Sequence, residues 1–130
     1  MNRIDILIAV DVDGALASGS LQNNVYLVDS NKYIGSWNQG QSGLVTACQD
    51  GTTLTWGVTS IDPGDDVEIT EFSGQLVDSK VCQPASNPVA GNGAWSGLVE
   101  SQGQFASFAY TVTLAMQSSQ QSFSAAIKVV

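Results

Sequence analysis

The stretch 107–116 constrains the fold most strongly, because a large apolar residue occupies every second position in it. These residues are Phe108, Tyr110, Val112, Leu114 and Met116, and small or polar residues stand between them. A side-chain period of two is typical of a β-strand with one buried face. No window of the chain sustains the 3.6-residue period of a helix, so we expect strands and no helix.

Weaker alternation predicts further strands at 54–58, 67–69 and 123–129, and the apolar runs 4–12 and 25–28 predict central strands covered on both faces. Glycines separate these segments, and Asp62-Pro63-Gly64-Asp65 suits a type II turn between two strands. We therefore predict one all-β domain over residues 1–130. Its fold class is an antiparallel β-sandwich of about seven to nine strands.

The charge balance excludes several functions. Twelve acidic residues face four basic ones, and without histidine the formal net charge is −8. Such a field repels phosphate backbones, so we expect no nucleic-acid partner. The absence of imidazole removes Ser-His-Asp catalysis and every histidine metal site. Much familiar catalysis is therefore excluded, and we expect a protein that is not an enzyme.

The N-terminal apolar run and the cysteines bear on the compartment. Asp11 and Asp13 interrupt the run too early for a secretory signal, which needs about 7 to 15 apolar residues. No run approaches the roughly 18 apolar residues of a membrane span. We expect a cytoplasmic protein with no membrane partner. Cys48 and Cys82 are then expected as buried free thiols, with a disulfide between them as the open alternative.

The run that ends in Asp11-Val12-Asp13-Gly14 resembles the first motif of the haloacid dehalogenase phosphatases, in which an Asp nucleophile works beside magnesium. Gly64-Asp65-Asp66 is similar to their late acidic motif. Ala15 departs from the motif, and the interval between the two motifs shows none of the crossover helices that a parallel sheet needs. A magnesium-dependent phosphatase remains the enzymatic alternative.

Calcium is the cofactor that suits the many Asp and Asn residues, because carboxylate and amide oxygens are hard ligands. Ala15 and Gln22 exclude an EF-hand after Asp11. Two loop clusters remain as candidates, and in each the side chains could instead only shape turns. The predicted metal ligands are Asp62, Asp65 and Asp66, and the second cluster is Asn23, Asn24, Asp29 and Asn31.

Three tryptophans offer aromatic faces in a small domain. Trp56 lies in an alternating run and is expected in the core. Trp37 and Trp95 stand among turn residues, where an aromatic ring either stacks on a ligand such as a sugar or anchors the core. The sequence leaves these two alternatives open.

Several ordered blocks resemble the bacterial AidA/PixA inclusion-body protein family. They include Val10 to Leu16, Asn24 to Asp29, Asn31 to Trp37, Cys48 to Gly51 and the closing Ile127-Lys128-Val129, and they span nearly the whole chain. A departure is Ser124-Ala125-Ala126, where Pro-Phe is expected. The resemblance implies an abundant cytoplasmic protein of a proteobacterium, often under quorum-sensing control and linked to host interaction or crystalline inclusions. It implies no catalytic residues, and sugar binding with calcium is carried over from some relatives as a hypothesis.

Together these observations predict a self-associating, lectin-like module that binds carbohydrate with calcium, either in cytoplasmic inclusions or released to act on a host. A homo-oligomer is expected because a sandwich has strand edges, and this chain has few charges to block them. The alternative is a purely structural assembly protein without a small ligand. The predicted sugar-site residues are Asn24, Asp29, Asn31, Trp37 and Trp95.

Overall fold

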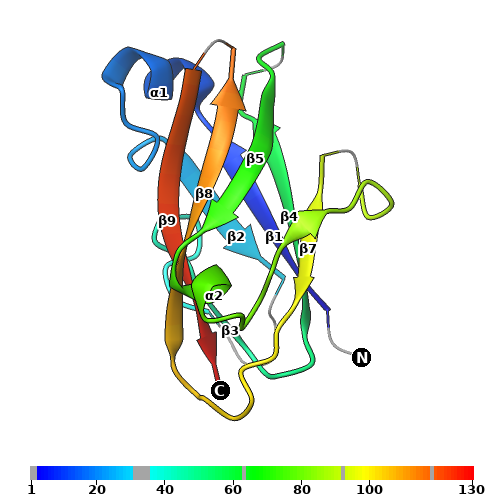
Figure 1. Ribbon diagram of the computed structural model, residues 1–130. Helices are drawn as coiled ribbons and strands as arrows, with labels where there is room; N and C mark the ends of the chain where they lie inside the picture. The colour runs from blue at the N-terminus through cyan, green and yellow to red at the C-terminus, as the bar shows by residue number, and fades with distance from the viewer. Residues whose placement is uncertain (1–2, 31–35, 63, 92, 118) are drawn as a thin grey trace.

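The computed structural model describes residues 3–30, 36–62, 64–91, 93–117 and 119–130, and these form two packed β-sheets (Figure 1). The first sheet has the strand order β2-β1-β4-β7-β6 and the second the order β3-β9-β8-β5. Strands of the first sheet are β1 (Arg3–Val10), β2 (Val25–Asp29), β4 (Thr53–Ser60), β6 (Ala85–Ser86) and β7 (Trp95–Leu98). Strands of the second are β3 (Val45–Cys48), β5 (Val67–Ser73), β8 (Ser107–Met116) and β9 (Ser119–Val129).

The predicted β-sandwich is confirmed, but its pairing is mixed and not wholly antiparallel. β1 pairs with β4 in parallel, and so does β3 with β9. Between β2 and β4 the chain crosses to the second sheet to form β3. It therefore returns beside β1 in the same direction, instead of turning back through a hairpin.

Two short helices were not expected from the sequence, and the prediction of no helix is wrong at α1 (Val12–Ser18) and α2 (Gln75–Asp78). The Asp11 carboxylate caps α1 by accepting the Gly14 N–H at 3.0 Å. Gly19, with φ of 71°, ends the helix. A helix of seven residues makes about two turns, which is too short to show a 3.6-residue period in the sequence.

An aromatic cluster fills the space between the sheets. Trp56 of β4 lies 4.8 Å from Phe72 of β5 and 5.8 Å from Tyr110 of β8, measured between ring centroids. The Trp56 indole N–H donates to the Tyr110 hydroxyl at 3.4 Å, and burial raises the pKa of Tyr110. The alternation predicted for 107–116 is confirmed, because its five large apolar residues are all buried.

The expectation that β1 and β2 are covered on both faces is wrong. β1 buries one side of its strand, formed by Ile4, Ile6, Ile8 and Val10. On the other side Leu7 is exposed, together with Tyr26 and Val28 of β2. No other layer of the described chain lies over this face of the first sheet. β1 is an interior strand as predicted, whereas β2 is an edge strand.

Both cysteines are free and buried, so the expectation of buried free thiols agrees with the structure. Burial raises the pKa of the Cys48 thiol to about 12, with the charge of Asp50 adding to the effect. Burial likewise raises the pKa of Cys82 to about 12. In the described part of the chain, no helix is long and apolar enough to cross a membrane.

Two glycines test the packing of the first sheet. A Cβ on Gly97 of β7 would lie 2.6 Å from the buried Cys82 sulfur, whereas one on Gly57 of β4 would meet nothing within 4 Å. We predict that Gly97→Ala lowers the free energy of unfolding by about 1–3 kcal/mol through overpacking. Gly57→Ala is the matched control and should change it by less than about 0.5 kcal/mol. Urea unfolding at low protein concentration measures both, and equal effects would contradict the packing described.

Candidate functional site

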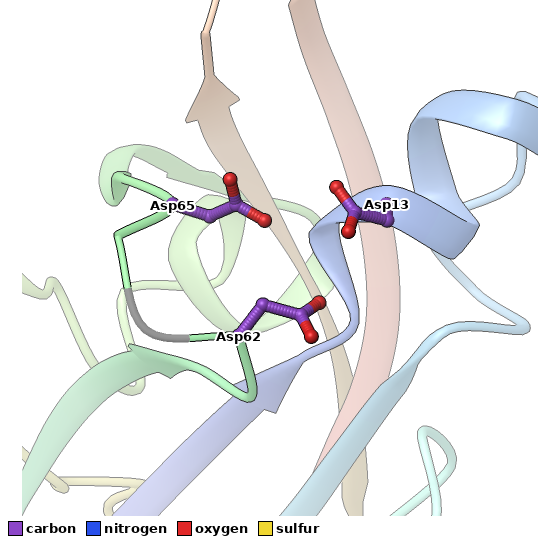
Figure 2. A group of neighbouring side chains, drawn as sticks. All are labelled: Asp13, Asp62 and Asp65. Carbon is purple, nitrogen blue, oxygen red and sulfur yellow. The ribbon is translucent and has the colours of Figure 1, made fainter.

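Three carboxylates converge at one end of the sandwich (Figure 2). Asp13 lies in the first turn of α1, and Asp62 and Asp65 lie in the connection between β4 and β5. One carboxylate oxygen from each residue lies within 4.8 Å of the other two. We call these three residues the acidic cluster.

The parallel pairing of β1 and β4 brings the acidic cluster together. Val10 and Ser60 are register partners at the ends of these strands, and the Ile61 N–H donates to the Val10 carbonyl at 2.9 Å. The carboxyl ends of parallel strands lie at the same edge of a sheet, so α1 and the β4–β5 turn begin side by side. Segments about 50 residues apart in sequence therefore place their acids within one site.

The turn itself agrees with the sequence prediction. The Asp65 N–H donates to the Asp62 carbonyl at 3.2 Å, which closes a β-turn between β4 and β5. Gly64 has φ of 98°, a left-handed value that glycine adopts without the strain of a Cβ. This geometry directs both aspartates of the turn toward Asp13 (Figure 2).

The cluster carries negative charge without a basic partner among the described residues. Among the described residues, an ion pair joins Arg3 to Asp5, and it lies away from the acidic cluster. The pKa of Asp65 is raised, first because partial desolvation disfavours its charged form and then because of the charge of Asp13 and a hydrogen bond with it. Asp62 and Asp66 add to the shift. Such a site can lower its energy by taking up a proton or a cation.

The predicted metal set overlaps this cluster without matching it. Asp62 and Asp65 are in both, whereas the third member of the cluster is Asp13 and not Asp66. The sequence did single out Asp13, but as part of the phosphatase-like motif. Its partner in that motif, Asp11, uses its carboxylate to cap α1. The two acidic motifs of the sequence thus meet in space through Asp13.

Two of the predicted sugar-site residues, Asn24 and Asp29, lie at opposite ends of β2. Asn24, just before β2, donates from its side-chain amide to the Ser18 hydroxyl at 3.1 Å and the Ser20 carbonyl at 2.8 Å, which fixes the turn after α1. Asp29 ends β2, so the two residues are about 16 Å apart along the strand. Asn31 lies outside the described residues.

Asp29 links the two sheets at their open side. Its carboxylate accepts from the Gln39 side-chain amide at 2.7 Å and from the Thr46 hydroxyl at 2.8 Å. Thr46 belongs to β3 of the second sheet, whereas Asp29 belongs to the first. These hydrogen bonds join β2, β3 and the segment between them.

The two candidate tryptophans differ in exposure. Trp37 is 51% exposed and lies under the Lys128 ammonium, which is 4.9 Å from the ring centroid. Trp95 is partly buried, packs against the aromatic cluster and has its ring 5.4 Å from that of Phe72. Trp37 is thus the one of the two that offers an open aromatic surface.

The fold and the site define a β-sandwich protein with an acidic loop cluster at one end. This chain belongs to the family described as a domain of unknown function, DUF8788, whose family model matches residues 2–122. No curated protein matches the chain.

The fold is similar to that of a solved inclusion body protein, PixA from Burkholderia cenocepacia J2315, with a TM-score of 0.69. The match covers 99% of this chain and 95% of that one at 14% identity. The resemblance to inclusion-body proteins predicted from the sequence is confirmed at the level of the fold.

Because the pKa of Asp65 is raised, the stability of the protein should depend on pH. The folded chain binds the Asp65 proton more tightly than the unfolded chain. Partial desolvation of the Asp65 carboxylate, together with the neighbouring negative charges, therefore lowers stability above the folded pKa, and this effect vanishes below the ordinary value of 3.8. With chelator present, Asp65→Asn should be more stable than wild type at pH 7. The difference in melting temperature should shrink as the pH falls toward 3.8. A difference that is constant over this range would contradict the electrostatic origin of the shift.

Proposed function

We propose that the protein is a non-enzymatic, self-associating module of inclusion-body type that binds calcium at the acidic cluster and carbohydrate through it. The single observation that carries the proposal is the convergence of three carboxylates without a basic partner among the described residues. The likeness in fold to an inclusion body protein supports accumulation of the protein in a bacterial cytoplasm.

Calcium fits the donor set of the cluster. Ca²⁺ takes six to eight oxygen ligands in flexible geometry, and loop carboxylates adjust to it more easily than to the strict octahedron of Mg²⁺. Asp13, Asp62 and Asp65 supply three carboxylates. A bound divalent cation would offset the repulsion that, after desolvation, contributes to the raised pKa of Asp65.

Carbohydrate is the ligand class that such a site suits. Three carboxylates leave several of the calcium positions open, and neighbouring hydroxyls of a sugar can supply the missing oxygens. The exposed face of Trp37 is a second surface on which a sugar ring could stack, at a different place on the molecule. The cluster and Trp37 are therefore tested separately.

A non-enzymatic role is supported by how the phosphatase-like motif is used. The first aspartate of that motif, Asp11, caps a helix of only seven residues through the Gly14 N–H. Val12 between the two aspartates is buried, and Asp13 turns to the acidic cluster. Hydrolysis of phosphate esters with magnesium, lost in Asp11→Asn, would contradict this part of the proposal.

Calcium binding is tested by thermal unfolding of the full chain. Calcium at about 100 times its Kd should stabilise wild type by about 2.7 kcal/mol. Asp62→Asn and Asp13→Asn should lose this gain. Asp78→Asn, the same change on an exposed aspartate of α2, is the matched control and should keep it. An equal calcium response in all four proteins would contradict binding at the cluster.

Carbohydrate binding is tested on a glycan array with and without a chelator. We expect binding to particular sugars that the chelator abolishes, because calcium would hold both protein and sugar oxygens. Trp37→Ala should leave that binding unchanged if the acidic cluster is the sugar site. A loss of binding in Trp37→Ala with calcium dependence intact would move the sugar to Trp37. The absence of all sugar binding would favour the purely structural assembly protein.

A further inference from the structure

The outer face of the first sheet carries an unusual amount of exposed apolar surface. Leu7 is 44% exposed, Tyr26 44%, Val28 41% and Leu98 52%, and all four point away from the core. We call these four residues the outer apolar face. The apolar runs that form β1 and β2 have the pattern of strands covered on both faces, yet the described chain covers only one.

A groove crosses this face. Val28, Leu7 and Gly57 are register partners on three adjacent strands, so they form one row across β2, β1 and β4. Nothing lies within 4 Å of the position that a Cβ on Gly57 would take. The resulting groove has a volume of about 460 Å³, and Ala90 and Ala94 lie along its wall. The exposed Leu7 side chain thus stands next to the open space over Gly57, so that a Leu7 side chain from a second copy could enter that space.

The sheet edges are less available for association than this face. Backbone hydrogen bonds from the turn at Gln41 cover the middle of β2, and Trp37 pairs with β3. β6 has two residues, and a bulge between Ile69 and Glu71 interrupts β5. Bulges and short or covered strands are the means by which proteins block edge pairing. The self-association expected from open edges therefore has to use a face.

Charge favours a second copy of this chain as the occupant of the outer apolar face. The chain carries −8, so two copies repel each other over most orientations. On this face Arg3 and Asp5 form an ion pair at 2.8 Å, and both side chains are more than half exposed. The remaining acid of the groove, Asp29, already accepts from Gln39 and Thr46. A neighbouring cation and anion form a self-complementary pair when the face meets its own copy about a two-fold axis.

The size of the face indicates how strong the contact is. At about 4.8 Å between strands and about 3.3 Å per residue, a sheet of five strands, none longer than eight residues, covers at most roughly 600 Å². A standard stable interface buries about 800 Å² on each partner. We therefore expect a reversible dimer whose population depends on concentration.

We propose that two copies of this chain associate through their outer apolar faces, with Leu7 of each copy over Gly57 of the other and Arg3 of each beside Asp5 of the other. This rests on the self-association in the proposed function and gives it a surface. It does not involve the acidic cluster, which lies at the end of the sandwich beyond β1 and β4 (Figure 1, Figure 2).

Sedimentation velocity of the full chain over a range of concentrations tests the surface. Leu7→Lys should weaken dimerisation at least tenfold, because each copy would bring an ammonium group into the apolar contact. Phe105→Lys, the same kind of change at a loop residue that is 69% exposed, is the matched control and should dimerise like wild type.

A charge exchange makes the test independent of apolar packing. Arg3→Asp alone and Asp5→Arg alone should each be monomeric where wild type is dimeric, because each places like charges in contact. An equimolar mixture of the two variants should form a heterodimer, since one copy then carries two carboxylates and the other two guanidinium groups. Both positions are exposed, so neither change disturbs the core.

The outcomes separate the two proposals. A wild-type chain that is monomeric at every concentration would overturn both the self-association and this surface. A wild-type dimer that persists in Leu7→Lys, or single charge variants that do not recombine, would overturn the surface alone. Loss of calcium or sugar binding in the acidic-cluster variants would leave this result unchanged.

Discussion

The indole of Trp56 and the phenol of Tyr110 meet between the two sheets, and the arrangement of both sheets depends on this contact. Each ring carries a polar group that must find a partner once it is buried. The hydrogen bond between them, together with Phe72 packed against both rings, satisfies that need and fixes how β4 faces β8. Because the inner faces of both sheets are buried in the core, groups that could bind a ligand or a partner lie at the strand ends and on the outer faces.

The acidic cluster at the ends of β1 and β4 results from the parallel pairing of these two strands. A hairpin would bring together only residues close in sequence, but a parallel pair brings the exits of two distant strands to one edge. α1 and the β4–β5 turn leave from that edge, and their aspartates repel one another there. Repulsion of this kind lowers the stability of the free protein, and a bound cation would relieve it. The site is thus a consequence of topology and is not visible in either motif alone.

Local patterns predicted the parts of the fold that local physics determines. The alternation before Met116 predicted β8, and the Pro-Gly pair after Asp62 predicted the turn between β4 and β5. α1 was missed because a seven-residue helix held by an Asp11 cap has no periodic pattern to detect. The parallel pairing of β1 with β4 depends on where the chain crosses between sheets, and the sequence pattern contains no signal for that choice.

The placement of the predicted site residues follows from local and long-range contacts of different kinds. Asp62 and Asp65 could be grouped from the sequence because one turn holds them close together, whereas Asp13 joins them only through the long-range pairing of β1 with β4. Asn24 and Asp29 were chosen as ligands for their oxygen and amide groups, but the fold uses these groups in its own hydrogen bonds. A polar residue near a turn satisfies backbone and loop groups as readily as it binds a ligand, and sequence does not distinguish the two.

The central claim is that the acidic cluster is a calcium site. A crystal structure of the protein grown with calcium tests it most directly. We predict a single strong density peak bonded to oxygens of Asp13, Asp62 and Asp65 at about 2.3–2.6 Å. A cluster without such a peak at saturating calcium, with its carboxylates turned away from one another, would contradict the account.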